Sequence, residues 1–233
     1  MTTTLARLAI IPGLIIIIYI YSKDKVEKEP IGLIIRLLIY GMLCCFVAGY
    51  AEQIVSAMLP QFPLGSPLQA MTTAFCVAGF CEELVKYLAL RLGSWNNPSF
   101  NYRFDGIVYG VSVAVGFAIL ENVMYVAMYG FGTAVARAFT AVPLHAFCGA
   151  VMGILYSYAK KSSIDGDRTS ATIYGFAAWL LPLIIHGVYD TFAMMRTQTA
   201  SIMLIVFIIL LYIFVVKMIN KMSRDDYRGG FYR

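Results

Sequence analysis

The sequence predicts an all-α integral membrane protein, a bundle of about seven transmembrane helices with a polar site inside the third to sixth of them. Of the 233 residues, 60% are hydrophobic and only 13% are charged. Apolar runs of about 20 residues, long enough to cross the hydrocarbon core of a bilayer, recur from one end of the chain to the other. No polar stretch between them is long enough to fold separately. We therefore expect residues 1–233 to form a single polytopic membrane domain.

The expected helices follow these apolar runs and the connectors between them. The first run has a longer apolar core than a signal peptide and no small-residue cleavage site after it, so we expect it to remain as a helix. The connector PQFPLGSP is uncharged and rich in turn-forming residues. The helices are expected at residues 3–22, 31–58, 68–91, 105–128, 132–159, 171–194 and 199–220.

Positively charged residues indicate the orientation of the bundle. With the N-terminus outside, the loops 23–30, 92–104 and 160–170 and the C-terminal tail lie inside, and they hold most of the Lys and Arg residues. This distribution agrees with the positive-inside rule. We therefore expect a multi-pass protein of the cell membrane with a cytoplasmic C-terminus. The net charge of +5 then reflects topology in the lipid bilayer and does not indicate nucleic-acid binding.

The expected third helix carries three ionisable side chains, Glu82, Glu83 and Lys86. Each such group at mid-bilayer costs roughly 2.5 to 3.5 kcal/mol on insertion scales, so a function is needed to offset that cost. Lys86 follows Glu82 by four residues and Glu83 by three, so on a helix it can pair with either one while the other stays free to act. An ion pair that only fixes helix packing is the alternative, but it explains one glutamate and not two.

The expected fourth helix places Glu121 deep in an apolar stretch. Glu121 shares a helical face with Gly106 and Gly110, and Asn122 lies beside it. Glycines on that face allow a neighbouring helix to approach closely. We expect Glu121 to belong to a site, the alternative being a buried carboxyl that is held neutral by desolvation.

The expected fifth helix repeats this arrangement with a histidine. His145, Gly149 and Gly153 are four residues apart, so the imidazole lies on a glycine stripe. Arg137 lies two turns before His145 and nearer to the outer surface. It can support the site, or it can extend to the membrane interface instead.

The expected sixth helix carries His186 and, four residues later, Asp190, with Tyr189 beside them. A carboxylate one turn from an imidazole can fix its tautomer and orientation. His145 and His186 are the only histidines of the chain, and both fall in the middle of apolar helices. We therefore expect both to be functional groups; satisfied core histidines are the alternative.

Polar groups thus face inward from four consecutive helices, which places a catalytic core at about residues 68–194. Intramembrane ionisable groups of this kind face a cavity or one another. Around a bound water, a carboxylate can act as general base, a histidine or a protonated acid can protonate the leaving group, and neutral donors can stabilise the oxyanion. The constellation predicts hydrolysis inside the membrane. The expected catalytic residues are Glu82, Glu83, Glu121, His145, His186 and Asp190, supported by Lys86, Asn122, Arg137 and Tyr189.

These stretches also resemble the PrsW family of bacterial intramembrane proteases. The matching motifs are EELVK, DGIVYG, GFAILEN, the Arg and His of RAFTAVPLH, and HGVYD, and the likeness runs from about residue 8 to about residue 220. The resemblance implies site-1 cleavage of a single-pass anti-sigma factor, after which a second intramembrane protease releases the sigma factor under envelope stress.

PrsW-like proteins are in turn distantly similar to the CAAX prenyl endopeptidases. By this similarity the paired glutamates are Glu82 and Glu83, the lone histidine is His145, and the last motif contains His186 and Asp190. One position departs from the wider pattern, because the segment FAILE ends in a glutamate where the other enzymes have histidine. Their water-activating Glu/His pair is therefore not assumed here.

The paired-glutamate pattern resembles enzymes that are treated as glutamic-type peptidases. Two histidines and several carboxylates could hold zinc, but the chain has no H-E-x-x-H motif. We therefore expect a peptidase without a metal or other cofactor, and zinc is the alternative.

A proton-coupled transporter or channel is the rival function, because buried carboxylates and histidines also build proton relays. Such carriers typically show internal repeats and interrupted helices at their binding sites. Neither feature is evident in the sequence, so we favour the protease.

Overall fold

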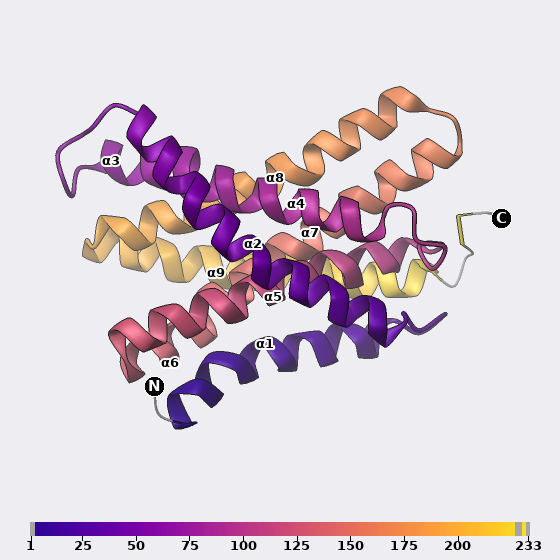
Figure 1. Ribbon diagram of the computed structural model, residues 1–233, viewed down its shortest axis with the longest axis horizontal. Helices are drawn as coiled ribbons and strands as arrows, with labels where there is room; N and C mark the ends of the chain where they lie inside the picture. Colours follow the sequence, from indigo (N-terminus) through magenta and orange to yellow (C-terminus); the bar gives the residue numbers. More distant parts are fainter. Residues whose placement is uncertain (1–2, 227–229, 232–233) are drawn as a thin grey trace.

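The structure is a computed structural model that describes residues 3–226 and 230–231, and this part of the chain is helical without any strand. The predicted all-α fold class is confirmed. Figure 1 shows the long helices running side by side across the molecule. The helices are α1 (Thr3–Lys23), α2 (Ile31–Met58), α3 (Pro67–Met71), the π-helix η1 (Thr72–Gly79), α4 (Phe80–Ser94), α5 (Arg103–Tyr129), α6 (Phe131–Phe139), α7 (Ala141–Ile164), α8 (Arg168–Met195) and α9 (Gln198–Asp225).

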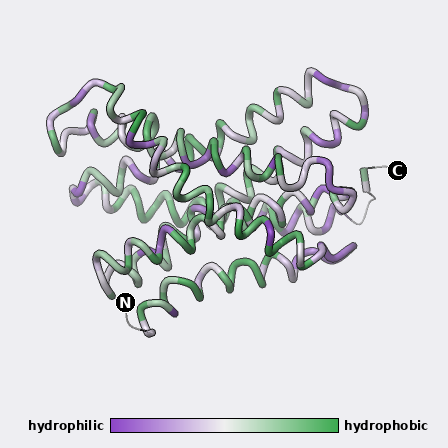
Figure 2. Tube along the Cα trace, viewed as in Figure 1, coloured by the Kyte–Doolittle hydropathy of each residue, from purple (hydrophilic) through white to green (hydrophobic). Residues whose placement is uncertain are grey.

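Six stretches of the described chain are long and apolar enough to cross a membrane: α1, α2, α5, α6 with α7, α8 and α9. Figure 2 shows hydrophobic residues along these helices and hydrophilic stretches mainly at the loops. The outer helices α1 and α9 expose many large apolar side chains, as a lipid-facing surface requires.

The expected third helix differs from the prediction, because it consists of α3, η1 and α4 rather than one α-helix over 68–91. A π-helix adds a residue to each turn and is often found at functional sites. Close packing on α8 accompanies it. A Cβ atom at Gly79 would lie 3.2 Å from the carbonyl oxygen of Leu183 on α8, and one at Gly187 on α8 would lie 2.4 Å from the ring of Phe75. The segment before α4 is thus held against α8.

The expected fifth helix, predicted as one element over 132–159, is broken at Thr140, which has φ −122° and ψ −75°. Pro143 explains the break. Proline has no N–H to bond the carbonyl of Phe139, and its ring would clash with that carbonyl in a continuous helix. The chain therefore ends α6 at Phe139 and starts α7 at Ala141, with Leu144 donating to the carbonyl of Thr140 at 3.0 Å.

Helix α5 lies at the centre of the bundle and is buried on nearly every face from Phe104 to Ile119. Its closest neighbour is α7, and the expected glycine stripes make the contact. A Cβ at Gly110 would lie 2.3 Å from the carbonyl oxygen of Gly149, and one at Gly153 would lie 2.1 Å from that of Gly106. The prediction that these glycines permit close helix packing is confirmed, and this contact sets α5 and α7 at a fixed register.

Buried carboxyl groups close the end of the bundle where α1 ends and α5 begins. Glu29, between α1 and α2, accepts a hydrogen bond from the Tyr109 hydroxyl of α5. Asp226, after α9, accepts from the backbone N–H groups of Arg103 (3.1 Å) and Phe104 (3.3 Å) at the start of α5. Burial raises the pKa of Glu29 to about 7 and the pKa of Asp226 to about 6. These contacts hold the loops and the α9 terminus against α5.

Candidate active site

Lys86 lies at the centre of a polar cluster inside the bundle. Its ammonium group is 3.0 Å from Oε2 of Glu82 and 2.9 Å from Oε1 of Glu83, both one turn earlier on α4. It is also 3.1 Å from Nδ1 of His145 on α7 and 3.9 Å from the centre of the Phe117 ring on α5. An ammonium has three N–H donors, and here three acceptors surround it. The expectation that one glutamate would stay free of the lysine is therefore wrong.

His186 on α8 is held between two carboxylates. Its Nδ1 is 2.9 Å from Oε1 of Glu83, and its Nε2 is 3.4 Å from Oδ2 of Asp190 one turn later on α8. A protonated ring can donate to both partners at once. The ring of His145 lies edge-on to that of His186, with 5.1 Å between their centres. The two histidines thus meet beside the glutamates of α4.

Glu121 on α5 ties His145 to Arg137. Oε2 of Glu121 is 2.9 Å from Nε2 of His145 and 2.5 Å from Nη2 of Arg137. Nε of Arg137 also donates to Oδ1 of Asn122 at 3.1 Å, and the Asn122 amide donates to the carbonyl of Ala9 on α1 at 3.0 Å. Arg137 therefore belongs to the site and does not extend to the membrane interface.

The hydrogen bonds around His145 determine its tautomer. Nδ1 faces the ammonium group of Lys86 and must accept, because an ammonium can only donate. Nε2 faces the Glu121 carboxylate and must therefore carry the proton. The hydrogen bonds are therefore donated in one direction, from Lys86 to the imidazole of His145 and from the imidazole to Glu121.

A cavity of about 340 Å³ lies against this cluster. The side chain of Glu82 is on its wall, whereas Glu83 is fully buried behind the wall with 0% exposure. A second hollow, of about 640 Å³, shares Glu52 with the cavity and continues along α2 to Gln61. The ionisable and hydroxyl-bearing side chains on the cavity wall are Glu52, Thr73, Glu82, Glu121, Tyr125, Arg137, His145, His186, Tyr189 and Asp190.

Glu52 on α2 is the acidic residue of this cavity that the sequence interpretation missed. It is the only acidic residue of α2, whose other residues are mostly apolar. An isolated acid within a transmembrane run marks a functional position by default, so this signal was present. The other predicted residues are gathered as expected from α4, α5, α6, α7 and α8.

Four residues of the cluster could in principle hold a metal ion. One ligand atom from each of Glu82, Glu83, His145 and His186 lies within 4.8 Å of all the others. Histidine nitrogen and carboxylate oxygen are suitable zinc ligands. The ammonium group of Lys86, however, lies within 3.1 Å of three of these residues. A cation already occupies the space between them, so the arrangement does not fit a metal without a movement of Lys86.

Helices long and apolar enough to span a membrane enclose carboxylates, histidines and a cavity, which is the arrangement expected of an enzyme with its reactive groups inside the membrane. The family model described as "PrsW family intramembrane metalloprotease" matches residues 29–219. The chain belongs to the PrsW family of intramembrane proteases.

Curated relatives support this assignment over most of the chain. Protease PrsW of Geobacillus kaustophilus is 33% identical over 80% of this chain and 78% of the relative. Protease PrsW of Clostridioides difficile is 32% identical over 91% and 88%, and Protease PrsW of Bacillus subtilis is 30% identical over 78% of each chain. No solved structure matches the chain. The relatives are named as proteases, so the rival transporter or channel function gains no support.

Proposed function

We propose that this protease cleaves a single-pass anti-sigma factor within the membrane, with Glu82 as the general base and without a metal. The observation that carries the proposal is the position of Glu82, which is on the cavity wall and is held by Lys86 at 3.0 Å. A general base must reach a water beside the scissile carbonyl. Glu83, fully buried behind it, cannot meet this requirement without a rearrangement.

The other residues of the cluster take complementary roles in the proposed reaction. Glu82 removes a proton from water, and the resulting hydroxide attacks the scissile carbonyl. His186, oriented by Glu83 and Asp190, protonates the leaving amine. Arg137 lines the cavity and has five N–H donors, of which Glu121 and Asn122 take two. Its remaining donors stabilise the oxyanion.

Lys86 supports the metal-free mechanism. A divalent ion between the same carboxylates would lie against a buried ammonium group, and this repulsion is strong where little water screens it. In our proposal the lysine supplies the positive charge that zinc supplies in other hydrolases. Zinc remains the alternative, and it requires Lys86 to leave the space between Glu82, Glu83 and His145.

The family resemblance supports the proposed substrate, and the distribution of charges supports the proposed orientation. The family resemblance implies an anti-sigma factor as the substrate and cleavage as the first of two proteolytic steps. The basic loops support an N-terminus outside and a C-terminus in the cytoplasm. The hollow along α2 that joins the cavity provides a path for an extended segment of the substrate.

Coexpression with candidate single-pass anti-sigma factors tests the proposal. Wild type is compared with Glu82→Gln and with the matched control Glu27→Gln, which alters an exposed glutamate in the loop after α1. We expect Glu82→Gln to lower cleavage at least about a hundredfold, the scale of a lost general base, while Glu27→Gln cleaves normally. Full cleavage by a membrane-inserted Glu82→Gln protein would refute the assignment. Mass spectrometry of the product identifies the bond that is cut.

A further inference from the structure

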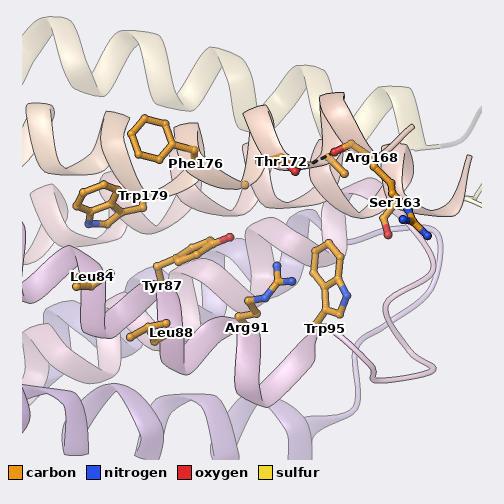
Figure 3. A pocket seen from close by; sticks show the side chains of 12 residues that line it. Leu84, Tyr87, Leu88, Arg91, Trp95, Ser163, Arg168, Thr172, Phe176 and Trp179 are labelled. Atoms are coloured by element: carbon orange, nitrogen blue, oxygen red, sulfur yellow. Dashed lines mark hydrogen bonds between the residues drawn. The ribbon is translucent and has the colours of Figure 1, made fainter. Parts of the chain in front are cut away.

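A groove of about 510 Å³ lies between α4 and α8, on a different face of α4 from Lys86 and its partners. Figure 3 shows its side chains arranged by polarity along the groove. Trp95 and Arg168 lie toward one end with Arg91 beside Trp95, and Leu84 and Trp179 lie at the other end. Its volume is in the range of ordinary small-molecule sites. None of the roles assigned to the catalytic cluster uses this groove.

The polar end of the groove presents two arginines. The guanidinium of Arg91 lies 4.4 Å from the centre of the Trp95 ring. Lys160 fixes the same tryptophan by donating to its carbonyl oxygen at 2.7 Å. Within the described part of the chain, neither Arg91 nor Arg168 forms an ion pair. This end of the groove is therefore positively charged, and its guanidinium N–H donors are not engaged by a carboxylate of the described residues.

The acidic residues of the neighbouring loop do not neutralise these arginines. Asp165 pairs with Lys161 at 2.5 Å, and Asp167 accepts from the backbone N–H of Ser170 at 3.0 Å as the cap of α8. The Ser170 hydrogen bonds lower the pKa of Asp167, which is consistent with a carboxylate engaged at a helix start. Both acids are thus engaged in local contacts.

The apolar length of the groove matches the depth of one membrane leaflet. Arg168 and Trp179 are eleven residues apart on α8, which corresponds to about 16 Å at 1.5 Å per residue. Half of the hydrocarbon core is about 15 Å. Leu88, 46% exposed, and Phe176, 56% exposed, lie along this length. The groove thus has a cationic end and an apolar wall whose length suits one leaflet.

We propose that the groove between α4 and α8 binds one phospholipid with an anionic headgroup, in the leaflet on the side of the loop 160–170. The phosphate contacts Arg91 and Arg168, and an acyl chain lies against Leu88 and Phe176. Arginine is well suited to phosphate because its donors form a planar fork. A free phosphate compound would leave the apolar length of the groove uncovered, so the structure favours the intact lipid.

Native mass spectrometry of the detergent-purified full chain tests this proposal. Dioleoylphosphatidylglycerol and dioleoylphosphatidylcholine are titrated separately, and we expect one molecule of the anionic lipid to bind at least about tenfold more tightly. The double variant Arg91→Gln/Arg168→Gln should lose this preference. The control Lys221→Gln/Arg224→Gln removes two exposed positive charges from α9 and should keep it. Ala171→Phe, which fills the groove without altering its charge, should also weaken binding.

Three results would overturn the proposal. Equal lipid preference in wild type and in the arginine double variant would refute the proposed contact between the headgroup and the two arginines. Displacement of the lipid by an equal concentration of glycerol 3-phosphate would indicate a phosphate site without acyl recognition. A photoreactive amino acid at Leu88 that captures a protein segment rather than lipid would identify a different occupant. Because binding is measured without proteolysis, and Glu82→Gln should bind lipid normally, failure here is separate from failure of the proposed reaction.

Discussion

Lys86 gives the buried site its charge balance. It contacts two glutamates and one histidine, and it is 0% exposed. Removal of one partner from such a cluster leaves an uncompensated buried charge, which typically costs about 3 to 5 kcal/mol. The same residue occupies the space that a metal would need. The catalytic type of the enzyme therefore depends on where this one ammonium group lies.

Chelation tests the metal-free mechanism at the level of this residue. We expect proteolysis by the purified enzyme to survive exhaustive treatment with a chelator, because in the proposed mechanism Glu82 rather than a metal activates the water. The measurement is cleavage of a reconstituted substrate before and after chelation, together with elemental analysis of the protein. Loss of activity, rescue by zinc and stoichiometric metal in the protein would reverse the proposal.

His186 and Asp190 should behave as one unit. If Asp190, 3.4 Å from Nε2 of His186, only orients the imidazole, the double variant His186→Ala/Asp190→Ala should be about as slow as His186→Ala alone. Residues that act together show such non-additive losses. The cleavage rates of the two single variants and the double variant provide the test. Losses that multiply would indicate separate roles for the two residues.

Sequence reasoning recovered contacts within one helix better than contacts between helices. The spacings of Glu82 and Lys86, and of His186 and Asp190, follow from one turn of an α-helix. The contact of Lys86 with His145 joins residues 59 positions apart, and no helical period encodes it. Glu52 was visible as a lone acid, but its nearness to the cavity depends on how α2 packs.

At the scale of elements, two interruptions shape the site. The π-helix η1 precedes the glutamates of α4, and the break at Thr140 separates Arg137 on α6 from His145 on α7. Hydrophobic periodicity does not reveal a π-helix, because its composition resembles that of the α-helices beside it. The break was readable from Pro143. Both interruptions replace helices that were expected to be continuous.

The glycine contact between α5 and α7 should be sensitive to a single methyl group. Gly153→Ala places a Cβ 2.1 Å from the carbonyl oxygen of Gly106, so the helices must move apart. Gly32→Ala on α2 is the matched control, because nothing lies within 4 Å of its Cβ position. We expect Gly153→Ala to lower the thermal midpoint in detergent by at least roughly 3 °C, the shift that about 1 kcal/mol produces in a chain of this size. An unchanged midpoint would argue against this tight contact.

At the scale of the whole molecule, two different kinds of interaction hold the bundle. Close backbone packing through glycines joins α5 to α7, whereas buried carboxyl groups join the loops and the end of α9 to the start of α5. The first kind has no titratable group. The second should make stability depend on pH.

Stability should fall as pH rises through the range in which Glu29 ionises. Burial raises the pKa of Glu29 from 4.5 to about 7, so the folded state binds this proton more tightly than the unfolded state. The resulting stabilisation is complete below about pH 4.5 and is lost as pH approaches 7. We expect the thermal midpoint to be lower at pH 8 than at pH 5, and Glu29→Gln to reduce this difference. The control Glu27→Gln, at an exposed position, should retain it; equal pH dependence in both variants would contradict the assignment.

The short distance in sequence between Lys86 and its two glutamates also matters for biosynthesis. His186, which contacts Glu83, lies 103 residues later in the chain. At about 5 to 20 residues per second, synthesis of this interval takes about 5 to 20 seconds. Lys86 follows within one turn of the same helix, so two of the three charges cancel before His145 and His186 are synthesised. The segment can therefore enter the bilayer with a net charge of about −1 rather than −2. A lysine supplied by a later helix would pair equally well in the finished protein, but it would come too late to ease this insertion.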